Sequence, residues 1–341
     1  MTEAPTDAEI VAAVRADAPD NTPGTRPIHA IGIVAKGYFQ ATPAAAQYTT
    51  AEHFQGGQFP ATVRFSNGSG SGIEHDNWPD VRGMATRFHL SGAPADLVMM
   101  SLPEFFVDNI AEFMKFTKAA LPEPPKRESP WAKLGDMLCL RPPLPDPQPD
   151  QTYVNTRGIM GYADAHRNTL LSVFDVGISG VPTSYCRLSY HCVNSFVLVA
   201  PDGRRRYVRF DWQPVAGVLK YPPGKAPGKK FLHEELRTRI ARWPARFILK
   251  MQVGQAGDAV NDPTRPFPKR RLTIEMGTLV LNEVPDDSEK IAEEIAFNPC
   301  RVPPGIDLSE DPILLARKGV YETSRKERGG MACPFHNGGA S

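Results

Sequence analysis

The chain has 341 residues, of which 41 % are hydrophobic, and its formal net charge is +1 at pH 7. This length and composition allow a large buried core and exclude a mainly disordered protein, and the near-zero charge gives no reason to expect nucleic acid as a partner. No apolar run reaches the roughly eighteen residues that span a bilayer, and the N-terminus is acidic where a signal peptide would be basic, so we expect a cytoplasmic protein without a membrane span.

Cysteine, proline and glycine usage narrows the fold class further. The five cysteines are scattered and none forms a Cys-x-x-Cys pair, so neither a disulfide framework nor structural zinc is expected. Thirty-four prolines and 28 glycines indicate many short elements joined by loops, which is more typical of a β fold than of a helical bundle.

The first hundred residues predict a short arm followed by strands. Residues 1–25 are polar and alanine-rich, and we interpret them as a peripheral N-terminal arm with a helix over 7–15. A β-prone run over 26–39 contains one histidine, His29, and alternating residues over 59–66 predict a second strand. The glycine-rich segment 67–72 is followed by neither Lys-Ser/Thr nor a helical pattern, so it predicts a turn and not a phosphate-binding loop.

The middle of the chain predicts a mixture of helices and antiparallel strands. Residues 121–152 are rich in proline and predict a connecting excursion over the surface around one helix. Two further strands, 194–200 and 207–212, are joined by a Pro-Asp-Gly hairpin turn. The other expected helices are 108–120, 131–140 and 231–242, and the other expected strands are 184–190 and the antiparallel pair 245–253 and 272–281.

A helix near the C-terminus carries the most informative pair of side chains. Asp311 followed by Pro312 is typical of an N-cap with proline in the first helical turn. Arg317 and Tyr321 are four residues apart, so they share one face of this helix and the guanidinium can lie against the phenol oxygen. A neighbouring cation favours the phenolate, which is an anionic ligand suited to ferric iron. Taken alone, the same spacing is also typical of an ordinary contact on a helix surface.

The surrounding motifs make the sequence resemble the catalase family. Leu-Asn-Glu-Val-Pro at 281–285, Ala-Phe-Asn-Pro at 296–299 and Pro-Gly-Ile at 304–306 precede the Arg-x-x-x-Tyr helix in the order of the family's haem-proximal region. Near the N-terminus, Arg26-x-x-His29 followed by Ala-x-Gly is similar to the family's distal motif. Val-Arg-Phe-Ser at 63–66, the Asp-x-Arg-Gly string at 80–83 and Asp-Leu-Val at 96–98 also match.

The resemblance covers roughly residues 26–328 and implies an α+β fold, an antiparallel eight-stranded β-barrel with surrounding helices that buries haem b. It implies His29 as the distal acid and base, with Ser66 holding its tautomer, and Tyr321 as the iron ligand. The charged or aromatic residues it places around the cofactor are Arg26, Arg64, Phe113, Arg317 and Arg328. The chain resembles a minimal catalase core, with residues 329–341 as a flexible tail.

The main departure from the family lies at Met100, where catalases place the asparagine that holds peroxide beside the histidine. Methionine donates no comparable hydrogen bond, and the gap-free match makes compensation by Ser101 the less favoured alternative. Phe105, Phe106 and Phe113 match positions that line the family's haem pocket. They are equally compatible with the ordinary core of a helix.

We therefore expect a haem peroxidase that acts on hydrogen peroxide or on organic, including fatty-acid, hydroperoxides with an unknown electron donor. Weak catalase activity is expected because Met100 replaces the amide. The alternatives are a haem-binding carrier or sensor without efficient turnover and a haem-free barrel scaffold. Assembly into a homo-oligomer stays open, and Cys333, Pro334 and His336 in the tail are too few to define a metal site.

Overall fold

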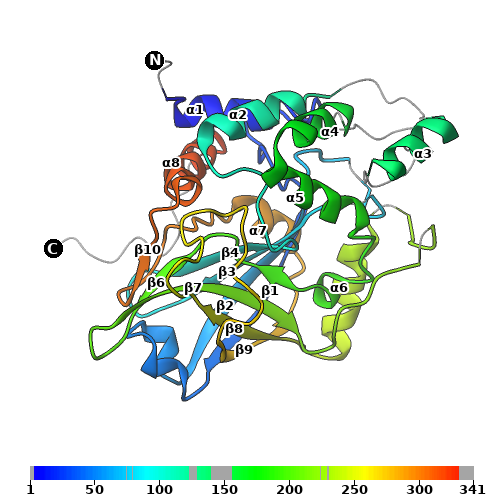
Figure 1. Ribbon diagram of the computed structural model, residues 1–341. Helices are drawn as coiled ribbons and strands as arrows, with labels where there is room; N and C mark the ends of the chain where they lie inside the picture. Colours follow the sequence, from blue (N-terminus) through cyan, green and yellow to red (C-terminus); the bar gives the residue numbers. More distant parts are fainter. Residues whose placement is uncertain are drawn as a thin grey trace.

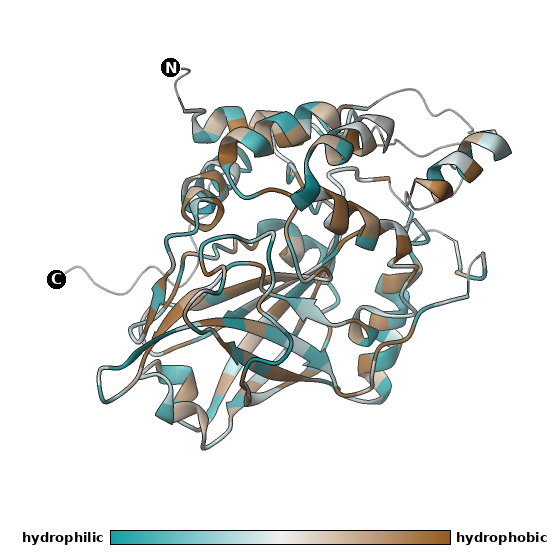
Figure 2. Cartoon of the chain, viewed as in Figure 1, coloured by the Kyte–Doolittle hydropathy of each residue, from teal (hydrophilic) through white to brown (hydrophobic). Residues whose placement is uncertain are grey.

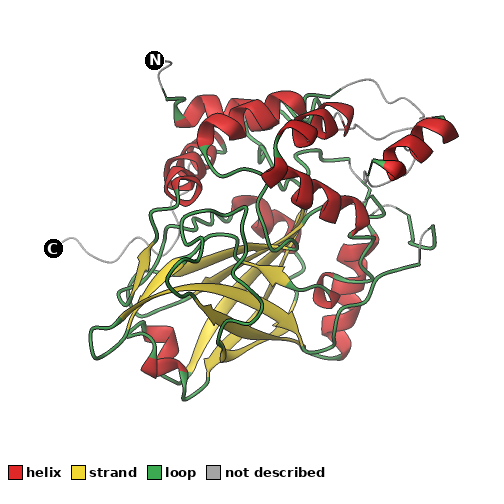
Figure 3. Cartoon of the chain, viewed as in Figure 1, coloured by secondary structure: helices red, strands yellow, loops and turns green. Residues whose placement is uncertain are grey.

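The computed structural model describes residues 4–73, 75–78, 80–122, 129–139, 156–222, 224–228 and 230–329. An antiparallel barrel forms one side of the molecule and helices cover the other (Figures 1 and 3). The strands are β1 (Gly32–Ala41), β2 (Gln58–Asn67), β3 (Arg82–Phe88), β4 (Ala95–Met100), β5 (Tyr190–His191), β6 (Phe196–Val199), β7 (Arg205–Pro214), β8 (Ala245–Val253), β9 (Thr273–Glu283) and β10 (Ile306–Leu308). The α-helices are α1 (Asp7–Arg15), α2 (Ile110–Ala119), α3 (Pro130–Leu138), α4 (Thr156–Ala165), α5 (Arg167–Ile178), α6 (Phe231–Arg242), α7 (Ser288–Glu294) and α8 (Pro312–Glu327).

The barrel closes because β9 pairs with β1 and β8 pairs with β7. Around the ring the order is β1, β2, β3, β4, β5, β7, β8 and β9. Strands β5 and β6 pair with the same edge of β7, β6 with its first half and β5 with its second. The eight-stranded antiparallel barrel expected from the sequence is thereby confirmed, and β10 extends the sheet beyond β6.

Alternation along each strand separates a packed interior from an outer face that carries polar groups. In β2, Val63 and Phe65 point into the barrel and belong to the apolar core, whereas Arg64 and Ser66 point to the outside. The interior is filled by large buried side chains, including Phe39 and Trp212. In Figure 2 the apolar residues of the strands are coloured brown.

Three helices cover the outer face of β2 to β4. Helix α8 begins at Pro312 with Asp311 as its N-cap, as expected, and α1 packs against both α8 and α2 (Figure 1). The expected helix 7–15 is present, but it is not peripheral: Ile10, Val11 and Val14 are buried beneath it. The N-terminal segment therefore forms part of the wall around the outer face of the barrel.

Several predicted elements have the expected bounds and others were wrong. Helix α6 and strand β8 coincide with the predictions, and the turn at 201–203 joins β6 to β7. The predicted strand 184–190 is wrong: the Ser184 side chain caps a 3₁₀ turn at Tyr185–Arg187, and only Tyr190 and His191 pair as a strand. Helices α4, α5 and α7 were not predicted.

Two predictions fall partly or wholly outside the described residues. Within the excursion 121–152, helix α3 is described and Trp131 on it is exposed, while 123–128 and 140–155 lie outside the described residues, as does the tail with Cys333, Pro334 and His336. Among the helices that the structure describes, none combines the length and apolar character needed to cross a membrane.

Candidate functional site

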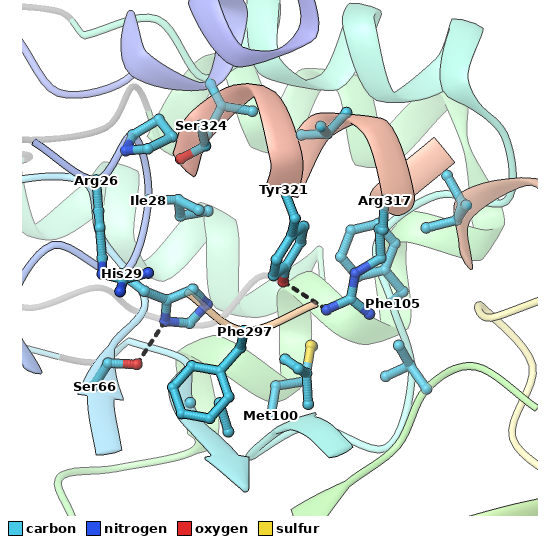
Figure 4. Close-up of a pocket in the computed structure, with 18 of the residues that line it drawn as sticks. Arg26, Ile28, His29, Ser66, Met100, Phe105, Phe297, Arg317, Tyr321 and Ser324 are labelled. Carbon is cyan, nitrogen blue, oxygen red and sulfur yellow. Dashed lines mark hydrogen bonds between the residues drawn. The ribbon is translucent and has the colours of Figure 1, made fainter. Parts of the chain in front are cut away.

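A cavity of about 230 Å³ lies between the outer face of β2–β4 and the helices α1, α2 and α8. The nine residues singled out from the sequence all line it, although they come from both ends of the chain and from its middle. They are Arg26, His29, Arg64, Ser66, Met100, Phe113, Arg317, Tyr321 and Arg328. Figure 4 shows His29 and Tyr321 projecting into this cavity from different elements.

The imidazole of His29 is held by the end of β2. Its Nδ1 lies 2.7 Å from the carbonyl oxygen of Asn67 and 3.0 Å from the hydroxyl of Ser66. A carbonyl can only accept, so this contact assigns the proton to Nδ1 and leaves Nε2 as the lone-pair nitrogen. The backbone of His29 has a φ of +56°, a conformation that a residue other than glycine adopts only when its surroundings enforce it.

Two further features keep His29 neutral and in place. Burial, followed by the charge of Arg64, lowers the pKa of His29 to about 4. A side chain at Gly83 on β3 would place a Cβ 2.6 Å from the Ser66 hydroxyl and 3.0 Å from the imidazole ring. Glycine at this position therefore leaves the space in which the histidine lies.

On the opposite wall, Tyr321 is held through a chain of buried hydrogen bonds. The guanidinium of Arg317 donates to the Tyr321 oxygen at 2.7 Å, one turn away on α8, and also to the Asn194 side-chain oxygen at 2.8 Å. The Asn194 amide in turn donates to Asp311 at 2.6 Å, and the other Asp311 oxygen accepts from the backbone of Ile313 and caps the helix. The N-cap and the phenol thus belong to one network.

Three arginines gather at one edge of the cavity. Arg64 donates to the carbonyl oxygens of Ala292 and His29, at 2.9 and 2.8 Å. Arg26 donates to the carbonyls of Ala292 and Ile295, and its buried Nε has no partner among the described residues. Burial lowers the pKa of Arg26, and the neighbouring charges of Arg64 and Arg328 lower it further.

One carboxylate faces this cluster but balances little of its charge. Glu293 lies 3.6 Å from Arg64, and its side chain is 46 % exposed. Arg328 lines the same edge and donates to the carbonyl of Ser324. The edge is therefore suited to a ligand that carries carboxylates.

The remaining wall is mainly apolar. Met100, Phe105 and Phe113 line it, as expected, whereas Phe106 does not: its ring stacks on Phe116 in the helical layer, with 5.1 Å between centroids. Ser101 does not replace the missing amide, because it points away from the cavity and its hydroxyl accepts from the backbone of Arg82 at 2.9 Å.

His191 lines the cavity and was missed by sequence reasoning. It pairs with Met100 across β4 and β5, and its Nδ1 lies 2.7 Å from a carboxylate oxygen of Asp211. If β5 kept the register in which β6 pairs with β7, Gln213 would lie opposite His191. The register shifts by two residues between β6 and β5, so Asp211 lies opposite His191 instead. No sequence pattern indicated that shift.

Asn194 and the apolar residues of α1 were missed as well. Asn194 stands at the start of a strand-like run, where nothing signals a contact with a helix more than a hundred residues away. Ile10, Val11 and Val14 belong to the predicted helix 7–15, but the interpretation of this segment as a peripheral arm gave them no role in the cavity wall.

Comparison with known proteins supports the resemblance. The catalase family profile matches residues 19–142 and 145–334. A catalase-related peroxidase from Mycolicibacterium paratuberculosis is 31 % identical over 319 residues, which cover 91 % of this chain and 90 % of that protein. A catalase-related peroxidase from Synechococcus elongatus is 26 % identical over 89 % of this chain and 84 % of its own.

Longer relatives match with only part of their length. Catalase-2 of Bacillus subtilis is 28 % identical over 92 % of this chain, but the match covers 46 % of that protein. The chain thus spans about half of such a catalase and nearly all of the catalase-related peroxidases. Since the family profile covers almost the whole sequence and the barrel, the imidazole and the arginine-bound phenol occur together, this chain is a member of the catalase family.

Proposed function

We propose that this catalase-family haem enzyme is a haem b peroxidase that reduces organic hydroperoxides in preference to disproportionating hydrogen peroxide. The observation that carries the proposal is the placement of His29 and Tyr321 on different walls of one apolar cavity, with arginines at its edge. Two catalase-related peroxidases, which align over 90 % and 84 % of their length, support a peroxidase activity.

The residues present fit haem b. A phenol oxygen that accepts from a buried guanidinium is a suitable anionic ligand for ferric iron, and Tyr321 is that group. The excess positive charge of Arg26, Arg64 and Arg328 suits two propionates, and the unpartnered Nε of Arg26 is a donor that such a carboxylate could satisfy. When bound, the haem iron accepts the two oxidising equivalents of a peroxide.

His29 would move the proton that peroxide cleavage requires. Its Nε2 accepts the proton from the hydroperoxide oxygen that approaches the cofactor, and then returns it to the oxygen that leaves as an alcohol or water. Asn67 and Ser66 hold Nδ1, so the imidazole keeps the tautomer with a free Nε2 throughout. A haem carrier or sensor would not need a base that is oriented in this way, so we rank that alternative lower.

Met100 and its neighbours set the expected substrate preference. The wall at this place offers a thioether and phenyl rings, which bind an alkyl chain better than they bind a second molecule of hydrogen peroxide. Ser101 supplies no replacement for the absent amide. We therefore expect faster reaction with a fatty-acid or aryl hydroperoxide than with hydrogen peroxide.

Absorption spectra of the haem-loaded protein test the ligand. We expect a ferric tyrosinate spectrum that is lost in Tyr321→Phe and kept in Tyr48→Phe. The second variant is a matched control, because Tyr48 also lies against an arginine, 5.6 Å from Arg206, but far from the cavity. An unchanged spectrum in Tyr321→Phe would refute the assignment.

Turnover tests the substrate preference. Oxygen release from hydrogen peroxide is compared with consumption of a fatty-acid hydroperoxide in the presence of a phenolic reductant. Oxygen release at a rate typical of catalases would contradict the proposed ranking of substrates.

A further inference from the structure

A continuous series of aromatic ring contacts leads from the cavity to the molecular surface. Phe113 and Phe105 line the cavity and their rings stack with 6.2 Å between centroids. Phe105 contacts Phe106 at 5.7 Å, Phe106 stacks on Phe116 at 5.1 Å, and Phe116 meets Tyr162 on α4 at 5.7 Å. Each step is a contact between packed rings, so the path crosses the layer between cavity and solvent without a gap.

The series ends in a polar group that the peroxide reaction does not use. The hydroxyl of Tyr162 donates to a carboxylate oxygen of Glu112 at 2.7 Å. The phenol ring stacks on His166, with 3.9 Å between centroids and 7° between planes. The side chain of His166 is 36 % exposed, and its Nε2 lies 3.2 Å from the same Glu112 oxygen. The cluster of Tyr162, Glu112 and His166 is therefore open to solvent. Lys115 contacts the other oxygen of Glu112.

Tyrosine differs from the phenylalanines before it because it can lose one electron, provided that its proton has an acceptor. Burial, and then the hydrogen bond to Glu112, raises the pKa of Tyr162. The phenol therefore stays protonated, and its proton leaves only together with an electron. The Glu112 oxygen at 2.7 Å is placed to take that proton.

We propose that Tyr162 is a surface oxidation site, at which electron-rich phenols or aromatic amines too large for the cavity deliver electrons to the cofactor along the Phe116–Phe106–Phe105 path. This inference rests on the proposed peroxidase function and supplies the class of its electron donor.

The electrons and protons balance over one peroxide. One hydroperoxide and two protons from solvent become an alcohol and water, and the cofactor supplies the two electrons that this conversion needs. In each of two steps Tyr162 loses one electron to the cofactor and its proton to Glu112, giving a neutral tyrosyl radical. A donor phenol then gives one electron to the radical, the proton returns from Glu112 to Tyr162, and the donor releases its own proton to solvent.

The experiment uses the full haem-loaded chain, mixed with a hydroperoxide and frozen within seconds. Electron paramagnetic resonance detects a tyrosyl radical, and covalent spin trapping followed by peptide mass spectrometry locates it. We expect the trap on Tyr162 in the wild type, no trap at this position in Tyr162→Phe, and a strongly reduced yield in Phe116→Leu, which interrupts the path and leaves the tyrosine in place. Tyr38→Phe is the matched control, since Tyr38 is a half-buried tyrosine on β1 outside the path.

Two further measurements separate this inference from the function on which it rests. The change in cofactor absorbance on adding hydroperoxide should be the same in Tyr162→Phe as in the wild type, whereas steady-state oxidation of tyramine coupled to a soluble dextran, a phenol too large to enter the cavity, should fall about tenfold or more. A wild type that responds to hydroperoxide but carries its radical elsewhere, or a Tyr162→Phe variant with unchanged phenol oxidation, would overturn the surface site alone. No response of the wild-type cofactor would overturn both proposals.

Discussion

If His29 is the base of the proposed reaction, its protonation state decides the pH range in which peroxide reacts. Its pKa lies at about 4, below the ordinary value of 6.5, because burial disfavours the imidazolium. The neutral base is therefore present above that value and is lost as the pH falls through it. We expect the rate of the cofactor's reaction with hydroperoxide to be level from about pH 8 to about pH 5 and to fall tenfold per unit below about pH 4.

Rapid mixing at a series of pH values measures this rate, with His29→Gln as the control whose slow reaction should show no such step. An inflection near pH 6.5 in the wild type would show that the imidazole is solvated and not buried as described.

Substitution of Met100 tests the preference against hydrogen peroxide. In Met100→Asn a donor is introduced into the wall beside His29, and one well-placed donor is worth about a hundredfold to a thousandfold in rate. Oxygen release from hydrogen peroxide should rise about tenfold or more, measured with an oxygen electrode. Met100→Leu fills similar space without a donor and should not raise it; an equal rise in both variants would attribute the effect to packing.

At the scale of residues, the sequence could identify side chains that lie inside short recognisable strings. His29, Ser66 and Tyr321 are of this kind, and all three line the cavity. The pair of His191 with Asp211 could not be found in this way, because it depends on how β5 meets β7. Contacts created by strand register are not visible before the register is known.

The N-cap of α8 joins helix stability to the position of the phenol. Asp311→Ala removes a cap worth about 1 kcal/mol and leaves the buried amide of Asn194 without its acceptor, which costs about 1–3 kcal/mol more. We expect a loss of about 2–4 kcal/mol in urea denaturation of the haem-free protein, together with weaker haem retention.

Asp287→Ala, at the start of helix α7, is the matched control for Asp311→Ala. Asp287 is the N-cap residue of α7 but makes no capping hydrogen bond through its side chain, so its removal should change stability by less than about 0.5 kcal/mol. Equal effects in the two variants would mean that the contacts of Asp311 contribute nothing specific.

At the scale of elements, strong local signals predicted helices and weak ones did not. Helix α8 has a capping aspartate and a proline in its first turn, and its start was predicted. Helix α5 begins at Arg167, and its N-cap residue, His166, makes no capping hydrogen bond through its side chain. Helix α4 contains Gly161, which disfavours a helix by about 1 kcal/mol. These two helices are stabilised by packing against each other, which the sequence does not display.

For the whole molecule, closure of the barrel depends on a close approach of β1 and β9. At Gly37 an added Cβ would lie 1.8 Å from the carbonyl oxygen of Val280, and backbone atoms cannot move aside cheaply. We expect Gly37→Ala to destabilise the protein by about 3 kcal/mol or more, measured by urea denaturation. Gly161→Ala, where the new methyl group meets nothing within 4 Å, should be neutral or slightly stabilising.

The cavity is built by parts of the chain that are almost as far apart in sequence as possible. Arg15 at the end of α1 nevertheless forms an ion pair with Glu327 at the end of α8, at 2.8 Å. Asp7 at the start of α1 lies beside Gly319, so the two helices run parallel. A linker that runs back along α1 to join residues 329 and 4, with new termini opened at the exposed turn of residues 201–203, would suit this fold. In such a circular permutant far fewer residues would separate the imidazole from the phenol, so the loop that brings them together would cost less entropy to close.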